Sequence, residues 1–207
     1  MLQFITKGDN KTLVVEQVKE ALAGGCQWIE LRMEGASDED IRQAISEIKP
    51  MCQEADAFLI ISGRVDLCKE LELGGVHLRK SDMLPSKARL ELGAGPVIGV
   101  DANTVEDITS VRSLDIDYIS LSPFRKENDD NALGIEGVKK LAEEMDRLEM
   151  ETPRVAAGNI LTDDVDAIMN TGVNGIAVSK AIADSRNIVD ETRKFIKLLE
   201  PYDKSGE

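Results

Sequence analysis

Short runs of apolar residues alternate along the whole chain with longer segments in which apolar residues recur at every third or fourth position. The short runs are typical of buried strands in a parallel sheet, and the longer segments are typical of amphipathic helices. Eight strands are therefore expected, at residues 2–6, 28–33, 57–61, 76–78, 96–100, 118–121, 153–157 and 175–178.

A helical segment follows each expected strand. The helices are predicted at residues 12–23, 37–53, 65–73, 85–92, 104–112, 135–148, 162–169 and 187–199. Ser37 and Asp40 resemble a capping box at the start of the second helix, and Pro50 is expected to shorten or kink that helix. Thr162 is the expected N-cap of the seventh helix.

Strict alternation of strands and helices predicts a parallel sheet with the helices outside it. Eight such units that close on themselves form a (β/α)8 TIM barrel, expected here as a single domain over residues 1–207 with a flexible tail at 200–207. An open, doubly wound sheet is the alternative. Such sheets usually carry a glycine-rich fingerprint after the first strand, and Lys7-Gly8-Asp9 is not one.

Composition narrows the kinds of partner. The formal net charge of −14 argues against nucleic-acid binding, which depends on a basic surface. Because the chain has neither a signal-like start nor a stretch of roughly 18 apolar residues, we expect no membrane association and a cytoplasmic location. Cys26, Cys52 and Cys68 lack metal-ligand spacing and lie in apolar runs, so they are expected to be reduced core residues.

The two last strands end in residues suited to binding a phosphate. Gly158 and Asn159 follow the seventh strand, while Val178 and Ser179 end the eighth. Neighbouring loops of this kind can surround an anion with backbone N–H groups, and the loops after strands seven and eight are the usual phosphate site of a barrel. The alternative is that the glycine only makes a turn.

Charged side chains follow the other strands, where a barrel places its chemistry. The cations of these loops favour an anionic substrate, unless they are only solvated: Arg32, Arg79, Lys80, Arg125 and Lys126. His77 is either a core residue or a proton-transfer group. The carboxylates of Glu34, Asp82 and Asp101 could bind a metal or face solvent. The polar segment 123–133 is expected to be a mobile lid.

Six segments, in this order and spacing, resemble the thiamine phosphate synthase and TenI family. They are GGVHLRKSDM, PVIGVDANT, DYISLSPF, LGIEG, VAAGNI and GIAVSKAI. Members of this family are barrel proteins that handle the pyrimidine and thiazole phosphates of thiamine, so the resemblance implies a barrel fold and phosphorylated small molecules as partners, with a homodimer left open.

The resemblance implies a transferase that joins hydroxymethylpyrimidine diphosphate to thiazole phosphate with Mg²⁺ and releases pyrophosphate. In that comparison Arg32 matches a diphosphate-binding arginine, Asp82 matches a metal-binding aspartate, and His77 matches the histidine of a V-H-L strand. We expect Arg32, His77 and Lys80 to be catalytic. The expected substrate-binding residues are Glu30, Ser62, Asp101, Ser122, Gly158, Asn159, Val178 and Ser179.

The sequence departs from the family pattern in the half that would bind Mg²⁺ and diphosphate. Glu30 replaces Gln and Glu34 replaces Lys, Ser62-Gly63 replaces Asn-Asp, Arg79-Lys80 replaces Gly-Gln, and Asp101 replaces Ser. Gly63 therefore removes one metal carboxylate.

Three hypotheses remain open. The first is a divergent synthase in which Arg79 or Lys80 supplies the lost charge. The second is a TenI-like thiazole phosphate isomerase that uses His77, Glu30 or Asp101 as an acid or base. The third is a non-catalytic binder of a thiazole or thiamine phosphate.

Overall fold

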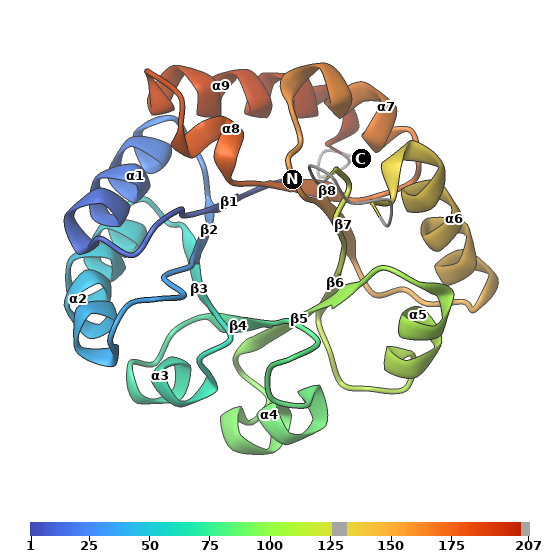
Figure 1. Cartoon of the computed structure of the whole chain (residues 1–207), viewed down its shortest axis with the longest axis horizontal. Coiled ribbons are helices and arrows are strands. Elements are labelled where there is room, and N and C mark those ends of the chain that lie inside the picture. The colour runs from blue at the N-terminus through green and yellow to red at the C-terminus, as the bar shows by residue number, and fades with distance from the viewer. Residues whose placement is uncertain (126–131, 204–207) are drawn as a thin grey trace.

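Eight parallel strands close into a barrel in the computed structural model, which describes residues 1–125 and 132–203. Each strand pairs with the next one in sequence, and β1 pairs with β8 (Figure 1). The strands are β1 Leu2–Ile5, β2 Trp28–Leu31, β3 Phe58–Ser62, β4 Gly75–Leu78, β5 Val97–Ala102, β6 Tyr118–Leu121, β7 Arg154–Ala157 and β8 Gly175–Val178. The predicted (β/α)8 TIM barrel is confirmed.

Helices surround the barrel and connect successive strands (Figure 1). The α-helices are α1 Lys11–Ala23, α2 Asp38–Glu54, α3 Val65–Glu70, α4 Pro85–Leu92, α5 Val105–Val111, α6 Gly134–Arg147, α7 Val165–Met169, α8 Lys180–Ala183 and α9 Ile188–Leu199. Two 3-10 helices, η1 Thr162–Asp164 and η2 Glu200–Tyr202, complete the described chain. No helix of residues 1–125 and 132–203 is long and apolar enough to cross a membrane.

Side chains alternate between the inside of the barrel and the helical layer, as the two-residue repeat of a strand requires. The helix-facing positions form the larger apolar core, which includes Phe4, Ile29 and Phe195. A smaller apolar cluster fills the barrel interior and contains Ile5, Ile60, Tyr118, Val155, Ala157 and Ala177. This apolar cluster leaves the polar inward positions to gather at the carboxyl ends of the strands.

The three cysteines are buried and free, as expected. Burial raises the pKa of Cys26 to about 11 and that of Cys52 to about 12. The pKa of Cys68 is likewise raised to about 11 by burial. These thiols are structural core residues, because the reactive thiolate form is disfavoured at each of them.

Two helices differ from the prediction. Thr162 was expected to cap the seventh helix, but it is the first residue of η1, and α7 begins only after Asp164. The prediction that Pro50 shortens α2 is wrong, since the helix continues through Pro50 to Glu54. Because Pro50 has no N–H, α2 continues past it with one intrahelical hydrogen bond fewer.

The first residues of the predicted tail form a short helix. Glu200–Tyr202, which were expected to belong to a flexible tail, form η2, and the Tyr202 hydroxyl donates a hydrogen bond to the Asp166 carboxylate. The remainder of that predicted tail, residues 204–207, lies outside the described residues.

Candidate functional site

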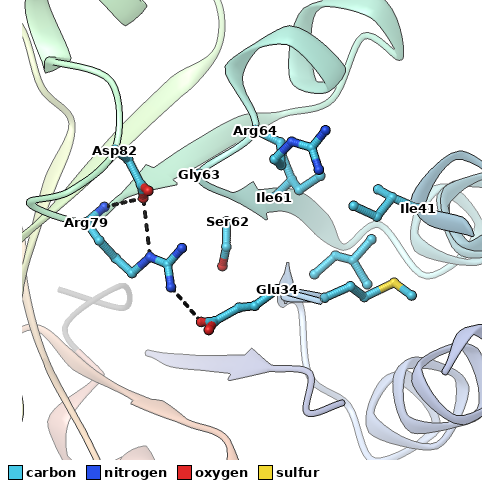
Figure 2. Close-up of a pocket in the computed structure, with 10 residues that line it drawn as sticks. Glu34, Ile41, Ile61, Ser62, Gly63, Arg64, Arg79 and Asp82 are labelled. Atoms are coloured by element: carbon cyan, nitrogen blue, oxygen red, sulfur yellow. Dashed lines mark hydrogen bonds and ion pairs between the residues drawn. The ribbon is translucent and has the colours of Figure 1, made fainter. Parts of the chain in front are cut away.

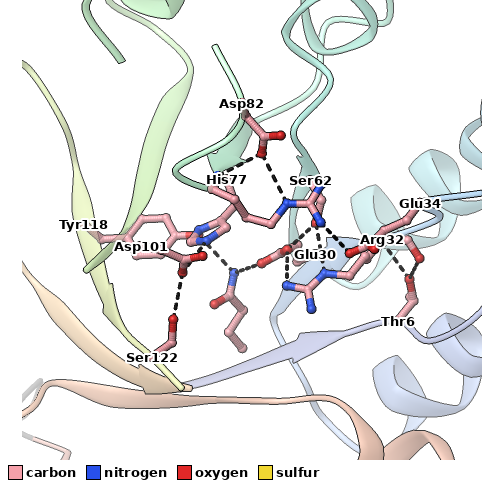
Figure 3. A network of polar contacts seen from close by, with 12 residues as sticks. Thr6, Glu30, Arg32, Glu34, Ser62, His77, Asp82, Asp101, Tyr118 and Ser122 are labelled. Atoms are coloured by element: carbon pink, nitrogen blue, oxygen red, sulfur yellow. Dashed lines mark hydrogen bonds and ion pairs between the residues drawn. The ribbon is translucent and has the colours of Figure 1, made fainter. Parts of the chain in front are cut away.

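Five consecutive strands each place one polar side chain in the mouth of the barrel. These residues are Glu30 on β2, Ser62 on β3, His77 on β4, Asp101 on β5 and Ser122 directly after β6. They face inward because each is separated by an even number of positions from an inward-facing residue of its own strand. The structure therefore brings together five residues that the sequence predicted for the site (Figure 3).

Arg32 is held in this group by two hydrogen bonds. Its Nη2 lies 3.1 Å from Glu30 Oε1, and its Nε lies 3.3 Å from Ser62 Oγ. Ser62 in turn donates a hydrogen bond to Glu30. Glu30 is almost fully buried, whereas about a third of the Arg32 side chain is exposed (32%). Glu30 thus fixes the direction of a guanidinium that still reaches the mouth.

His77 lies between a phenol and a carboxylate (Figure 3). Its Nδ1 is 2.7 Å from the Tyr118 hydroxyl, and its Nε2 is 3.0 Å from Asp101 Oδ1. Burial lowers the pKa of His77, but the carboxylates of Glu30 and Asp101 outweigh burial and raise that pKa above its ordinary value. The neighbouring carboxylates therefore favour the protonated form of His77 more than water does for a free histidine.

Asp101 connects His77 to the outer edge of the mouth. Its Oδ1 also accepts a hydrogen bond from Ser122 Oγ at 3.1 Å. Burial raises the pKa of Asp101, but the hydrogen bond and charge of His77 prevail, so this pKa is lowered. About a quarter of the Asp101 side chain is exposed (26%), against 4% for His77. A ligand would therefore touch the carboxylate before it could reach the imidazole.

A second cluster lies beside Ser62 and Gly63 and centres on Arg79 (Figure 2). Asp82 Oδ2 accepts hydrogen bonds from the backbone N–H of Arg79 at 2.8 Å and from its Nε at 3.3 Å. Arg79 Nη1 donates to Glu34 Oε1 at 2.6 Å. Two of the three carboxylates that could bind a metal, Glu34 and Asp82, are therefore engaged by one guanidinium.

The residues present do not suit the Mg²⁺ ion that the family resemblance implies. Divalent magnesium prefers near-octahedral oxygen ligands, of which the protein usually supplies one or two carboxylates. Asp82 is engaged by Arg79, and Gly63 offers no side chain. Within residues 1–125 and 132–203, no group of three or more His, Cys, Asp or Glu side chains is placed to hold a metal ion.

The opposite side of the mouth carries the loops after β7 and β8. Ala157 pairs with Ala177, so Gly158 and Val178 come next on adjacent strands. Gly158 has a φ of +110°, and a Cβ there would lie 2.9 Å from the backbone nitrogen of Phe124. Only glycine suits this close approach.

The ends of these two loops differ in exposure. Asn159 is exposed and has a φ of +49°. Val178 is buried, and Ser179 precedes α8 without a side-chain cap hydrogen bond. Arg125 donates to the Asn159 carbonyl at 3.0 Å and to Asp164 at 2.7 and 2.9 Å. The loop after β6 is thus attached to the loop after β7.

Lys80 lies apart from the Arg32 group. Its Nζ is 2.5 Å from Asn103 Oδ1 and 2.6 Å from Asp107 Oδ2, at the start of α5. Its catalytic role stays a prediction. Lys126 and the central part of the expected lid fall within residues 126–131, outside the described residues.

The sequence did not reveal how thoroughly the cations of the mouth are neutralised. Of the five cations predicted at the mouth, the four that the structure describes each pair with a carboxylate: Arg32 with Glu30, Arg79 with Glu34 and Asp82, Lys80 with Asp107, and Arg125 with Asp164. Gln3 and Tyr118 were also missed, although Gln3 hydrogen-bonds to both Glu30 at 3.0 Å and the Tyr118 hydroxyl at 3.3 Å. The two-residue repeat of β1 and β6 was the signal that could have placed both inside the barrel.

A closed parallel barrel with its polar side chains at the carboxyl ends of the strands defines the class: barrel proteins with a ligand site at the mouth. Within that class, the chain belongs to the family described as thiamine monophosphate synthase, whose profile matches residues 2–182.

Named relatives and a solved structure agree with this assignment. Thiamine-phosphate synthase of Bacteroides fragilis is 41% identical over 201 residues, which cover 95% of this chain and 98% of that protein. The corresponding protein of Bacteroides thetaiotaomicron is 40% identical over 95% of this chain and 96% of its own length. The structure of thiamine phosphate pyrophosphorylase from Pyrococcus furiosus superimposes with a TM-score of 0.86 at 28% identity, covering 97% of this chain and 95% of that one.

Proposed function

We propose that this chain is a thiamine phosphate synthase that joins hydroxymethylpyrimidine diphosphate to thiazole phosphate in thiamine biosynthesis. The observation that carries the proposal is the arrangement of Arg32 at the mouth. A buried carboxylate and a hydroxyl orient its guanidinium, part of which remains open to a ligand. The family membership and the relatives named thiamine-phosphate synthase support the same reaction.

The reaction breaks one bond and forms another. The C–O bond between the pyrimidine methylene and the diphosphate breaks, and its electron pair leaves with the diphosphate. The thiazole nitrogen then uses its lone pair to form the new C–N bond and becomes positively charged. Arg32 stabilises the negative charge that develops on the departing diphosphate, as preorganised donors do.

Asp101 stabilises the pyrimidine methylene during the same reaction. His77 Nε2 and Ser122 Oγ lie 3.0 Å and 3.1 Å from Asp101 Oδ1, and these contacts lower the pKa of the Asp101 carboxyl, which favours its ionised form. An anion at this place stabilises the positive charge that grows on the pyrimidine methylene as the diphosphate leaves. Glu30 and Ser62 position Arg32 and do not meet the reacting atoms.

The thiazole phosphate lies, in this proposal, against the loops of Gly158, Asn159, Val178 and Ser179. The neighbouring ends of β7 and β8 support this placement, since backbone N–H groups of two adjacent loops can surround one phosphate. The partners in this reaction are phosphorylated small molecules. We also propose a cytoplasmic location, and a homodimer stays an open expectation.

Product formation with both phosphorylated substrates tests the proposal. We expect thiamine phosphate to form, and Arg32→Ala to lower kcat by about 100-fold, the usual cost of removing one charge-stabilising donor. Arg42→Ala is the matched control, because Arg42 pairs with Glu70 on the outer surface at 2.7 Å. Product no higher than without protein would contradict the synthase assignment.

A TenI-like isomerase is the second candidate, favoured by the contact between His77 and Asp101. An imidazole bonded to a partly exposed carboxylate can relay a proton to a ligand in the mouth. This candidate predicts conversion of thiazole phosphate without the pyrimidine substrate, and loss of that conversion in Asp101→Asn. Thermal stabilisation by thiazole phosphate without any turnover would instead identify a non-catalytic binder.

A further inference from the structure

We propose that Arg79 binds the diphosphate of the substrate without a divalent cation, and that Glu34 occupies the place of that anion until the substrate arrives. The proposal rests on the proposed function for the identity of the anion. It assigns to a side chain of the loop after β4 the charge neutralisation that a metal would otherwise provide.

The first argument is that Arg79 is oriented in advance. Asp82 accepts both the backbone N–H and the Nε–H of Arg79 on the same oxygen, at 2.8 and 3.3 Å. Asp82 is itself well covered, with 14% of its side chain exposed. These two bonds hold the guanidinium in place and leave its Nη1 to donate to Glu34.

The second argument is that Glu34 is easily displaced. Its side chain is 56% exposed, and its bond to Arg79 Nη1 joins the loop after β2 to the loop after β4. An exposed ion pair of this kind contributes little to stability. A diphosphate carries more charge than one carboxylate and can accept two parallel N–H bonds from a guanidinium, so it competes well for Arg79.

The third argument is the position of this pair. Arg79 and Glu34 line a small pocket together with Ser62, Gly63 and Asp82 (Figure 2). Ser62 is also the hydrogen-bond partner of Arg32. Arg79 therefore lines the pocket itself, while Arg32, directly after β2, reaches its edge through the contact with Ser62 Oγ.

The fourth argument explains why Asp82 serves Arg79 and not a metal. Gly63 has a φ of +69°, and a Cβ there would lie 3.1 Å from Asp82 Oδ2. The absence of a side chain at Gly63 leaves the space in which Asp82 turns toward Arg79. As the C–O bond of the substrate breaks, Arg79 donates N–H bonds to the oxygen that receives the electron pair.

Titration calorimetry with sodium pyrophosphate tests the inference, with one series in EDTA and one in Mg²⁺. We expect binding in EDTA. Glu34→Gln should tighten that binding by about fivefold, because the competing carboxylate is removed. Arg79→Gln should weaken it by at least about tenfold, the effect of losing a charge-assisted bidentate contact. Glu70→Gln, which breaks the outer Arg42–Glu70 pair, should leave the binding unchanged.

Three results would overturn the inference: binding that requires Mg²⁺, an unchanged or weaker affinity in Glu34→Gln, or an unchanged affinity in Arg79→Gln. Circular dichroism and thermal melting establish that each variant is folded. Thiamine phosphate formation is measured separately, so the two proposals can fail independently. Pyrophosphate binding in EDTA without product supports the inference and contradicts the synthase, whereas product formed strictly with Mg²⁺ does the reverse.

Discussion

At the scale of single residues, His77 makes the stability of the barrel depend on pH. Its pKa in the folded chain is raised above the ordinary 6.5, chiefly because Glu30 and Asp101 overcome the effect of burial. A raised pKa contributes stability that is complete below the unfolded pKa and is lost as the pH rises through the folded value. A pKa difference of one between the two states corresponds to about 1.4 kcal/mol.

We therefore expect the free energy of unfolding of the wild type to fall between pH 6.5 and the folded pKa of His77, and to fall less in His77→Asn. Urea denaturation at a series of pH values measures this difference. His77→Asn removes the titrating group while keeping a polar side chain between Tyr118 and Asp101. Parallel curves for the two proteins would show that the pKa of His77 is the same in the folded and unfolded chains, contrary to the expectation.

At the scale of elements, the start of α5 connects helix capping to the mouth of the barrel. Thr104 Oγ1 accepts the backbone N–H of Asp107 at 3.1 Å, and Asp107 accepts the backbone N–H of Thr104 at 2.9 Å. The same Asp107 carboxylate binds Lys80 at 2.6 Å. One capping box thus also fixes a side chain of the loop after β4.

Thr104→Ala should destabilise the protein by about 1 kcal/mol, the usual cost of losing an N-cap side chain. Thr104→Ser keeps the oxygen and should retain most of that stability, which makes it the matched control. Thermal unfolding of both variants measures the effect. Equal losses in Ala and Ser would attribute the effect to the methyl group of Thr104 and not to the cap.

At the scale of the whole molecule, the net charge of −14 opposes the approach of a phosphorylated ligand. Arg32, Arg79, Lys80 and Arg125 do not reverse this field, since each of them has a carboxylate beside it. Raising the salt concentration from about 0.01 to about 0.1 M shortens the screening length from about 30 to about 10 Å. The association rate of thiazole phosphate should then rise a few-fold, which stopped-flow binding kinetics can measure.

The unphosphorylated thiazole alcohol is the control for that experiment, because its association should be insensitive to salt. An association rate that falls as salt increases would indicate a locally positive mouth, contrary to the pairing in the structure. Enzymes that attract their phosphate ligands electrostatically show the opposite dependence, an association rate that falls as salt increases.

Much of this architecture follows from sequence periodicity. Buried parallel strands are apolar on both faces, so each of the eight runs could be recognised, and the bounds predicted for β6, β8 and α4 agree with the structure. The seventh helix was harder to predict, because Thr162 has the composition of a cap but lies in η1. The preference of Thr for helix N-caps does not decide the conformation at this position, because tertiary context can override local propensity.

The site could be predicted only as a set of strand ends. Arg32, His77 and Asp101 were placed at the mouth because the carboxyl ends of parallel strands share one side of the sheet. Their partners could not be predicted, since pairing depends on how distant strands align. Glu34 and Arg79 are separated by 45 residues in sequence, and Gln3 and Tyr118 by 115.

The packing of Asp82 against Gly63 also constrains how this chain could change over evolutionary time. A new acidic residue at 63 would crowd the Asp82 carboxylate and strain a backbone with a φ of +69°. Such a substitution is tolerated only when Asp82 no longer bonds to Arg79. The effect of a substitution at 63 therefore depends on the residue at 79. Because the family pattern has an acid at 63 and Gly at 79, ancestry reconstructed along this lineage should show the loss of the acid at 63 before the appearance of Arg79, and never the reverse order.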